Sequence, residues 1–331
     1  MGTSIAYPFK KASIVMDYSN NKKIVFSENP DAIRYPASLT KTMTVYLLFE
    51  ALRAGKITLN TKFKTSKLAV MQIPSKIGVK IGEKITVQQL IRALLVKSAN
   101  DAAVVAAEGM CGSVKKFAVM MNKKAKQLGM KHTHFENPSG VPDGRQVTTA
   151  RDMLTLGIAV FKYFPQYWNY FSEKSFSYKG QAHNAHCKIT RWYKGADGGK
   201  TGFICASGFN LFVTAQRYNK NGKQKRMFVV VIGGDSTKSR DLYAAYLMDK
   251  FFGEYRIASK IAHLSKQKLK KKSGIMEKVL QTEEEFEIEK ALDYSAEIDE
   301  FYIDDEESMD IIEEELVLSM KKNHKEQSLS K

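Results

Sequence analysis

Apolar and alternating runs near both ends of the chain predict two pairs of β-strands. The first pair covers residues 11–17 and 24–27, separated by a polar turn. The second pair covers residues 208–217 and 226–232, and the Asn-Gly dipeptide at 221–222 favours a hairpin turn between them. Between the two pairs, apolar residues recur mainly at helical spacing.

The longest predicted helix covers residues 38–54, is apolar on most of its faces and ends at Gly55. A helix of this kind is expected in the centre of a hydrophobic core. Thr86 and Gln89 form a predicted capping box at the start of the next helix. The other predictions are helices at 87–96, 102–108, 114–128, 149–161 and 242–252, a break at 97–100 and a loop at 137–144.

This order of elements predicts an α/β protein of the mixed α+β kind. Strands from both ends of residues 1–255 would form one mostly antiparallel sheet with flanking helices, and the central helices would form an inserted lobe. Residues 256–276 are predicted to be either a basic linker or a basic amphipathic helix. Residues 277–331 are predicted to be an acidic, disordered tail with a transient helix at 311–318.

The composition supports a folded domain and adds a marked charge asymmetry. With 44% hydrophobic residues the chain can bury a core, and it has no apolar run long enough for a transmembrane helix. Residues 1–276 contain 46 Lys and Arg against 16 Asp and Glu, whereas residues 277–331 contain 6 against 19. The basic body suggests an acidic partner: nucleic acid, an anionic membrane or an acidic wall polymer. The alternative is a lysine-rich surface with no particular ligand.

Cysteines, candidate metal ligands and the start of the chain limit the chemistry further. Cys111, Cys187 and Cys205 allow at most one disulfide, so the core must supply most of the stability. His183, His186 and Cys187 have no fourth metal ligand at suitable spacing, and neither a metal nor a cofactor is predicted. The first residues lead almost directly into a strand, without a visible export signal or myristoylation pattern.

Three short polar motifs become informative through their context. Ser-x-x-Lys occurs six times and Ser-x-Asn three times, whereas Lys-Thr-Gly occurs once, at residues 200–202. Only the Ser-x-x-Lys at 38–41 begins a predicted buried helix, where both polar side chains share one face. The Ser-x-Asn at 98–100 lies at a break between helices, and Lys-Thr-Gly is expected to open a strand after a turn at 195–199. A nucleophile on a helix, a polar pair on a loop and a cation on a strand edge can converge on one groove.

These motifs occur in the order typical of penicillin-interacting serine enzymes. With them, the chain resembles the D-alanyl-D-alanine carboxypeptidases, the low-molecular-mass penicillin-binding proteins of serine peptidase family S11, over roughly residues 10–253. The resemblance implies a β-lactamase/DD-peptidase-like fold. The segments that carry it are PASLTKTMT at 36–44, KSANDA at 97–102 and DGGKTG at 197–202, with flanking similarity at 82–87, 128–130, 135–140 and 239–240.

The resemblance implies acyl transfer to a serine. Ser38 would attack the carbonyl of the penultimate D-alanine in a peptidoglycan stem pentapeptide and release the terminal D-alanine. Lys41 would act as the base, which requires a pKa depressed by burial and by the nearby cation of Lys200. Ser98 would relay the proton to the leaving amine, and Asn100 would hold the substrate amide.

The resemblance also implies a set of substrate-binding groups. The backbone N–H groups of the nucleophile and of Phe203 would stabilise the developing oxyanion. Thr201 and Arg240 would bind the terminal carboxylate, with charge from Lys200, and Gly202 completes the same strand motif. The alternative interpretation of Arg240 is a surface arginine at the start of a helix.

Four other functions are compatible with parts of the sequence. A D,D-endopeptidase cutting peptidoglycan crosslinks would use the same residues. A class A β-lactamase would need Glu-x-x-x-Asn between the second and third motifs, and Glu108, Glu136 and Glu173 all lack that asparagine. An inactive wall-binding module is opposed by the intact motifs, and a nucleic-acid binder by the scattered basic residues without a recognition helix.

The expected partners follow from these interpretations. They are a peptidoglycan stem peptide, β-lactam antibiotics as covalent inhibitors and a membrane surface contacted through residues 256–276, with no specific nucleic acid. The expected location is the bacterial periplasm or cell envelope. Asp197 is predicted to form a turn, and Cys205 to be a small packing residue near the site.

Overall fold

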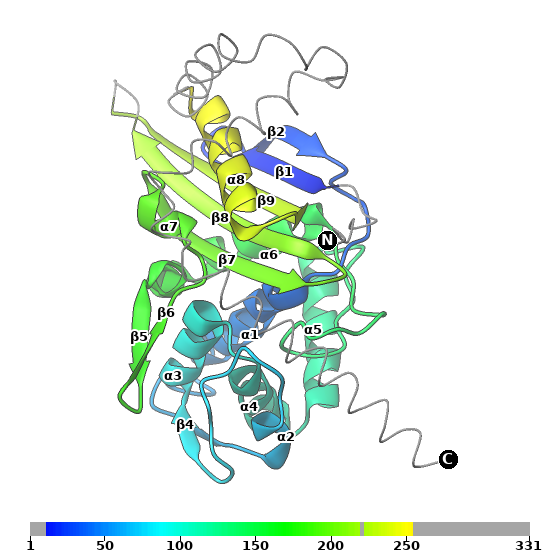
Figure 1. Ribbon diagram of the computed structural model, residues 1–331, viewed down its shortest axis with the longest axis vertical. Coiled ribbons are helices and arrows are strands. Elements are labelled where there is room, and N and C mark those ends of the chain that lie inside the picture. Colours follow the sequence, from blue (N-terminus) through cyan, green and yellow to red (C-terminus); the bar gives the residue numbers. More distant parts are fainter. Residues whose placement is uncertain (1–10, 219–221, 254–331) are drawn as a thin grey trace, which may run out of the picture.

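A five-stranded antiparallel sheet forms one half of the molecule and a helical lobe forms the other (Figure 1). The computed structural model describes residues 11–218 and 222–253. Along the sheet the strands lie in the order β2-β1-β9-β8-β7, so the first strands of the chain pair with the last ones. The strands are β1 (Ala12–Asp17), β2 (Lys23–Glu28), β7 (Ala196–Ile204), β8 (Gly208–Tyr218) and β9 (Gln224–Gly234).

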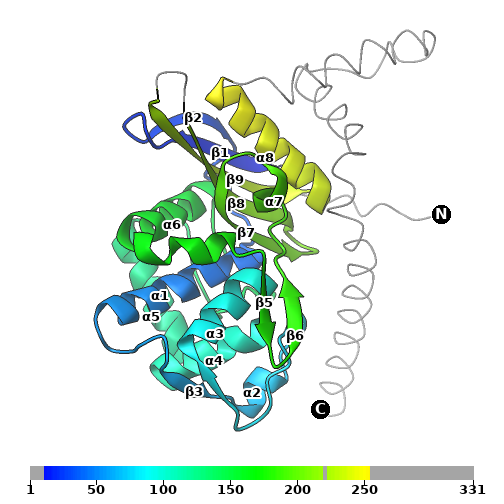
Figure 2. The ribbon, with the colours of Figure 1, turned by 90° about the vertical axis from the view of Figure 1, so that its left-hand side faces the viewer.

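The sheet is covered on both faces, which explains its nearly continuous apolar strands. Alternate residues of β9 enter two different hydrophobic clusters, because successive side chains of a strand point to opposite faces. Phe228 and Val230 pack towards the helical lobe, whereas Val229 and Val231 pack against α8 (Thr237–Phe252). Figure 2 shows α8 on one face of the sheet and α6 (Ala150–Tyr163) on the other.

The helical lobe is inserted between β2 and β7, as the order of elements predicts. It is built around α1 (Lys41–Arg53), whose residues are buried on nearly all sides. Two small two-stranded sheets, β3–β4 and β5–β6, lie within it, and neither was predicted from the sequence. The elements between β2 and β7, besides α6, are η1 (Ala37–Thr40), α1 (Lys41–Arg53), β3 (Lys62–Lys64), α2 (Lys67–Val70), β4 (Lys84–Thr86), α3 (Val87–Arg92), η2 (Ala93–Lys97), α4 (Asn100–Cys111), α5 (Val114–Leu128), η3 (Pro165–Ser172), β5 (Ser175–Tyr178), β6 (Gln181–Asn184) and α7 (Ile189–Trp192), of which α7 packs against the sheet.

Several predicted boundaries are confirmed by the structure. The α5 helix has the predicted bounds and ends at Gly129, which adopts the left-handed conformation typical of a helix end. Thr86 and Gln89 form the predicted capping box. The predicted hairpin of the second strand pair is present as β8 and β9, although Asn221 of its turn lies outside the described residues.

Two predicted elements are wrong in detail, and both carry motif residues. The helix predicted from Ser38 begins instead as the 3₁₀ turn η1, and its α-helical part starts at Lys41. The turn predicted at 195–199 is largely strand, because β7 begins at Ala196. Its glycines serve close packing: a Cβ on Gly198 would lie 2.5 Å from the Trp168 ring.

The predicted linker and tail at 256–276 and 277–331 lie outside the described residues. Within the described part, no helix combines the length and apolar character needed to cross a membrane.

Candidate active site

The three motifs meet where the sheet faces the helical lobe. β7 is the edge strand nearest the lobe and packs against η1 (Figure 1). Lys200 lies in the middle of β7, not at its start, and Ser98 lies between η2 and α4. The structure therefore brings together the 3₁₀ turn with Ser38, the interhelical break and the Lys-Thr-Gly strand.

The backbone around Ser38 is fixed by two glycines from distant parts of the chain. Ala37 has a positive φ of 47°, which is uncommon for a residue with a side chain. A Cβ on Gly140 would lie 1.9 Å from the Ala37 carbonyl oxygen, and a Cβ on Gly202 would lie 2.9 Å from the Ser38 nitrogen. Only residues without side chains allow this approach, so Gly140 and Gly202 determine where the hydroxyl points.

Lys41 is the most constrained side chain at the junction. It is fully buried, and its Nζ lies 2.7 Å from Ser38 Oγ, 2.7 Å from Asn100 Oδ1 and 2.6 Å from the Ser139 carbonyl oxygen. The Asn100 amide is oriented by its Nδ2 group, which donates 3.0 Å hydrogen bonds to the carbonyls of Ile73 and Pro74. Its Oδ1 must therefore face the lysine.

This set of partners suits a neutral amine. Asn100 Oδ1 and the Ser139 carbonyl can only accept, so they take both N–H groups of an uncharged Lys41. The remaining lone pair then faces Ser38 Oγ, whose hydroxyl can donate its proton to the nitrogen. The arrangement can therefore remove a proton from the serine.

The electrostatics favour the same neutral form. Burial holds the pKa of Lys41 well below its usual 10.5, and the charge of Lys200 lowers it further, whereas Asp101 opposes the shift. Burial and the charge of Lys200 are the two causes of a lowered Lys41 pKa that were predicted from the sequence.

Lys200 is the second buried lysine of the site. It is 1% exposed, and its Nζ donates 2.8 Å hydrogen bonds to Ser98 Oγ and to the Thr201 carbonyl. Burial lowers the pKa of Lys200 to about 7; Cys187 opposes this shift and the charge of Arg240 adds to it. Ser98 itself adopts a positive φ of 59°, which turns its side chain towards the strand.

Asp101 supports the wall of the site next to Asn100. Its carboxylate is fully buried and accepts backbone N–H groups from Ile77, Gly78 and Val79 at 3.0–3.3 Å. The N–H of Asn100 donates to the Ser75 carbonyl at 2.7 Å. These bonds hold the segment that orients the Asn100 amide.

The other predicted substrate-binding residues lie on two elements. Thr201 and Phe203 are on β7, and Arg240 is in the first turn of α8. Arg240 is 3% exposed, so its interpretation as a surface arginine is wrong. Its guanidinium donates to the Asp241 carboxylate at 2.8 Å and to the Asn210 carbonyl at 3.4 Å, and its charge acts on Lys200.

The structure also places the cysteines, the candidate metal ligands and Asp197. No disulfide joins the three cysteines, and Cys205 is exposed, so its prediction as a small packing residue is wrong. Within residues 11–218 and 222–253, no three His, Cys, Asp or Glu side chains are grouped to hold a metal. His183 packs against Phe176 with ring centroids 5.1 Å apart. Asp197 is part of β7, not a turn, and its carboxylate pairs with Arg226 at 2.6 Å.

Sequence reasoning missed three contributors to the site. Ser139 acts through its carbonyl, Gly140 through the absence of a side chain and Asp101 through backbone N–H groups. All three lie in segments that carry the family resemblance, at 135–140 and 97–102. That resemblance was the only sequence signal for them, because no side-chain motif marks a carbonyl acceptor.

Comparisons with known proteins agree with this geometry. The family described as D-alanyl-D-alanine carboxypeptidase matches residues 9–236. The chain is 32% identical over 248 residues to D-alanyl-D-alanine carboxypeptidase DacF of Bacillus subtilis, covering 73% of this chain and 62% of that protein. It is 35% identical over 248 residues to DacA of Haemophilus influenzae, covering 73% and 61%. It thus spans about 60% of the length of these relatives.

A solved structure extends the comparison to the fold. Penicillin binding protein 5 from Haemophilus influenzae superimposes with a TM-score of 0.69 at 31% identity, covering 76% of this chain and 72% of that one. The predicted DD-peptidase-like α/β fold is therefore confirmed.

Proposed function

The chain belongs to the D-alanyl-D-alanine carboxypeptidase family, and from this premise we propose that it is a serine-type carboxypeptidase acting on peptidoglycan stem peptides. It removes the terminal D-alanine through an acyl-enzyme on Ser38. The observation that carries the proposal is the buried Lys41 amine, 2.7 Å from Ser38 Oγ, with two acceptor-only partners for its N–H groups.

Acylation begins with proton transfer from Ser38 to Lys41. The oxygen attacks the penultimate D-alanine carbonyl, and the negative charge develops on the carbonyl oxygen. The backbone N–H groups of Ser38 and Phe203 stabilise that charge. Collapse breaks the peptide bond, the leaving amine takes a proton relayed through Ser98, and terminal D-alanine departs. Water then hydrolyses the ester and regenerates the serine.

The substrate carboxylate is bound by the cationic side of the site. Lys200 supplies the nearest charge, Thr201 a hydroxyl and Arg240 a second cation that acts over a longer range. A proton bound to Lys200 favours this carboxylate, and its hydrogen bond to Ser98 connects the binding group to the proton relay. Asn100 contributes by orienting Lys41 and by contact with the substrate amide.

The proposed activity also predicts a class of inhibitor and a location for the protein. A β-lactam carbonyl would acylate Ser38 in the same way, in keeping with the name of the penicillin-binding relative. Because the substrate is a component of the bacterial cell wall, we place the protein in the cell envelope. The contact of residues 256–276 with a membrane surface stays a prediction.

Intact mass spectrometry with benzylpenicillin tests the acylation step. The protein should gain one adduct of the mass of the antibiotic, and Ser38→Ala should gain none. Ser113→Ala is a matched control, because Ser113 also begins a Ser-x-x-Lys sequence but caps α5, where its Oγ accepts the Lys116 N–H. The control should still form the adduct.

A stem pentapeptide and a crosslinked dimer distinguish the peptidase activities. Release of free D-alanine from the pentapeptide supports the carboxypeptidase, whereas cleavage of the dimer alone would identify an endopeptidase. Rapid loss of free penicillin without a lasting adduct would instead identify a β-lactamase. An adduct on Ser38→Ala equal to that of the unaltered protein would refute the assignment of the nucleophile.

A further inference from the structure

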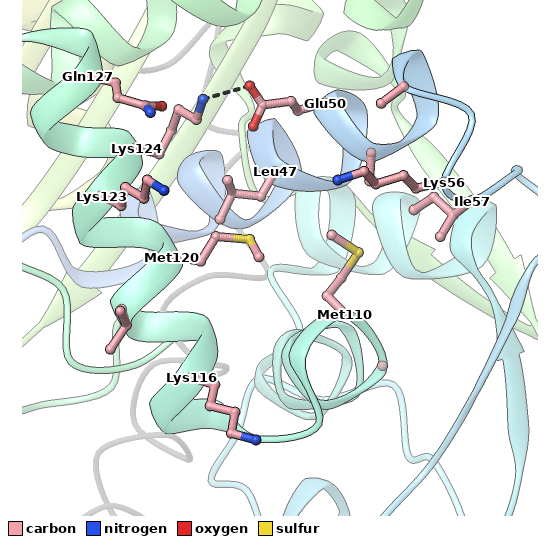
Figure 3. A pocket seen from close by; sticks show the side chains of 14 residues that line it. Leu47, Glu50, Lys56, Ile57, Met110, Lys116, Met120, Lys123, Lys124 and Gln127 are labelled. Carbon is pink, nitrogen blue, oxygen red and sulfur yellow. Dashed lines mark hydrogen bonds and ion pairs between the residues drawn. The ribbon is translucent and has the colours of Figure 1, made fainter.

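A groove of about 730 Å³ lies on the helical lobe, away from the catalytic residues. It follows the C-terminal half of α1, the C-terminal end of α4 and most of the length of α5, whereas Lys41 lies at the opposite end of α1. Figure 3 shows Met110 of α4 and Met120 of α5 facing one another across the groove, with Leu47 of α1 between them. Its floor is therefore apolar, and none of its lining residues belongs to the active site.

The rim of this groove is strongly basic. Lys56, Lys116, Lys123 and Lys124 line it, and Glu50 is the only acidic residue among the lining side chains. Lys124 pairs with Glu50 at 2.6 Å (Figure 3), whereas the other three lysines are exposed. An apolar floor with a cationic rim fits an amphipathic segment that carries acidic side chains beside apolar ones.

The chain itself contains a segment of this chemistry. Residues 309–320 read MDIIEEELVLSM, and residues 277–331 carry 19 acidic against 6 basic residues. In a helical register, Met309, Ile312, Leu316 and Met320 would share one face, with the acidic residues beside them. The 56 residues at 253–308 separate Phe252 from this segment, and at up to about 3.3 Å each their reach does not limit where it can bind.

We infer that the acidic segment 309–320 binds to the lysine-rimmed groove of its own chain. Its apolar face occupies the floor formed by Leu47, Met110 and Met120, and its carboxylates pair with Lys56, Lys116 and Lys123. The segment is tethered, so its effective concentration is high, on the order of millimolar for a flexible connection. Modest contacts are then sufficient for occupancy.

Carbodiimide cross-linking of the full-length chain tests this inference. The reagent joins lysines to carboxylates in direct contact, and peptide mass spectrometry identifies the joined residues. We expect links from Glu313–Glu315 to Lys116 and Lys123 within the monomer. Lys116→Glu/Lys123→Glu should reduce the yield of links from this segment to the remaining groove lysines, Lys56 and Lys124, by about tenfold, because two attractive pairs become repulsive and each exposed pair changes an equilibrium up to about fivefold.

Two further variants separate groove binding from general charge attraction. Lys115→Glu/Lys126→Glu makes the same charge change on exposed residues of α5 that do not line the groove, and should leave the yield within about twofold. Ile312→Ser/Leu316→Ser keeps every charge and should also reduce the links, because it removes the apolar contact. Far-ultraviolet circular dichroism checks that all variants are folded.

Three results would overturn the inference. The first is a set of links spread evenly over lysines outside the groove. The second is an equal loss in the two α5 variants or no loss in the serine variant. The third is groove links in covalent dimers only, which would assign the groove to the tail of a second copy.

Discussion

Replacing Lys41 by Met gives the sharpest test of the proposed base. The methionine fills most of the space of the buried side chain but cannot accept the proton of Ser38. General-base assistance contributes about 10²–10⁴ in rate, equivalent to about 2.7–5.5 kcal/mol in the barrier. We therefore expect acylation by benzylpenicillin to slow by two to four orders of magnitude, on the scale given by that range.

The Lys41→Met variant is expected to stay folded, with a moderate loss in its free energy of unfolding. Asn100 Oδ1 and the Ser139 carbonyl both lose a donor, which costs about 1–3 kcal/mol for each acceptor left without a partner. The buried methionine avoids the cost of burying an amine, which offsets part of this loss. Thermal unfolding should therefore show a folded protein with a moderately lower Tm.

Lys97→Met is the matched control for Lys41→Met. Lys97 ends η2 next to Ser98 and is half-buried, so the control removes a neighbouring cation through the same substitution. Its acylation rate should stay within about fivefold, the range of a partly screened charge. The assay is the time course of adduct formation by intact mass. A folded Lys41→Met protein that acylates within tenfold of the unaltered rate would refute the role of Lys41 as base.

Three further predictions concern the same site. Lys200 has a pKa of about 7, so the KM for a carboxylate-bearing peptide should rise above that pH, and Lys200→Arg, whose cation does not titrate, should remove this rise. Between pH 7 and 9 the unfolded chain binds more protons at Lys200 than the folded one, so the free energy of unfolding should increase with pH by up to about 1.4 kcal/mol per unit. Urea denaturation of Lys200→Met should show a smaller slope, and an unchanged slope would contradict the assignment. Gly140→Ala should lower both Tm and the acylation rate, because its φ is +90° and its Cβ would overlap the Ala37 carbonyl, whereas Gly144→Ala, with open space around it, should change neither.

The fold was predictable to the extent that burial pattern and chain order determine it. Strands at both ends of the sequence implied a sheet closed by the first and last strands, and β1 pairs with β9 along its whole length. The small sheets β3–β4 and β5–β6 were missed because their strands are only three or four residues long, too short for an alternating apolar pattern to stand out. The 195–199 segment was misassigned because glycine favours turns but also permits close packing.

The candidate site was predictable for side chains that form motifs and not for backbone groups. Ser38 and Lys41 could be paired from their spacing, and Lys200 could be connected to them by motif order. Nothing in the residue types indicated that the Ser139 carbonyl accepts from Lys41. A carbonyl is present at every position, so only the tertiary path of the chain decides which one lies at the amine.

The different roles proposed for the two buried lysines follow from their hydrogen-bond partners. Both lysines are buried, and burial lowers the pKa of each. Lys41, however, has two fixed acceptors and a serine hydroxyl, which together leave a neutral nitrogen with its lone pair directed at the nucleophile. Lys200 instead donates to a hydroxyl and to its neighbouring carbonyl on an edge strand, where we propose that it binds the substrate carboxylate. Asn100 and Ser139 thus distinguish the proposed base from the proposed cation. Substitutions that move either acceptor should impair proton removal from Ser38 more than binding of the substrate carboxylate.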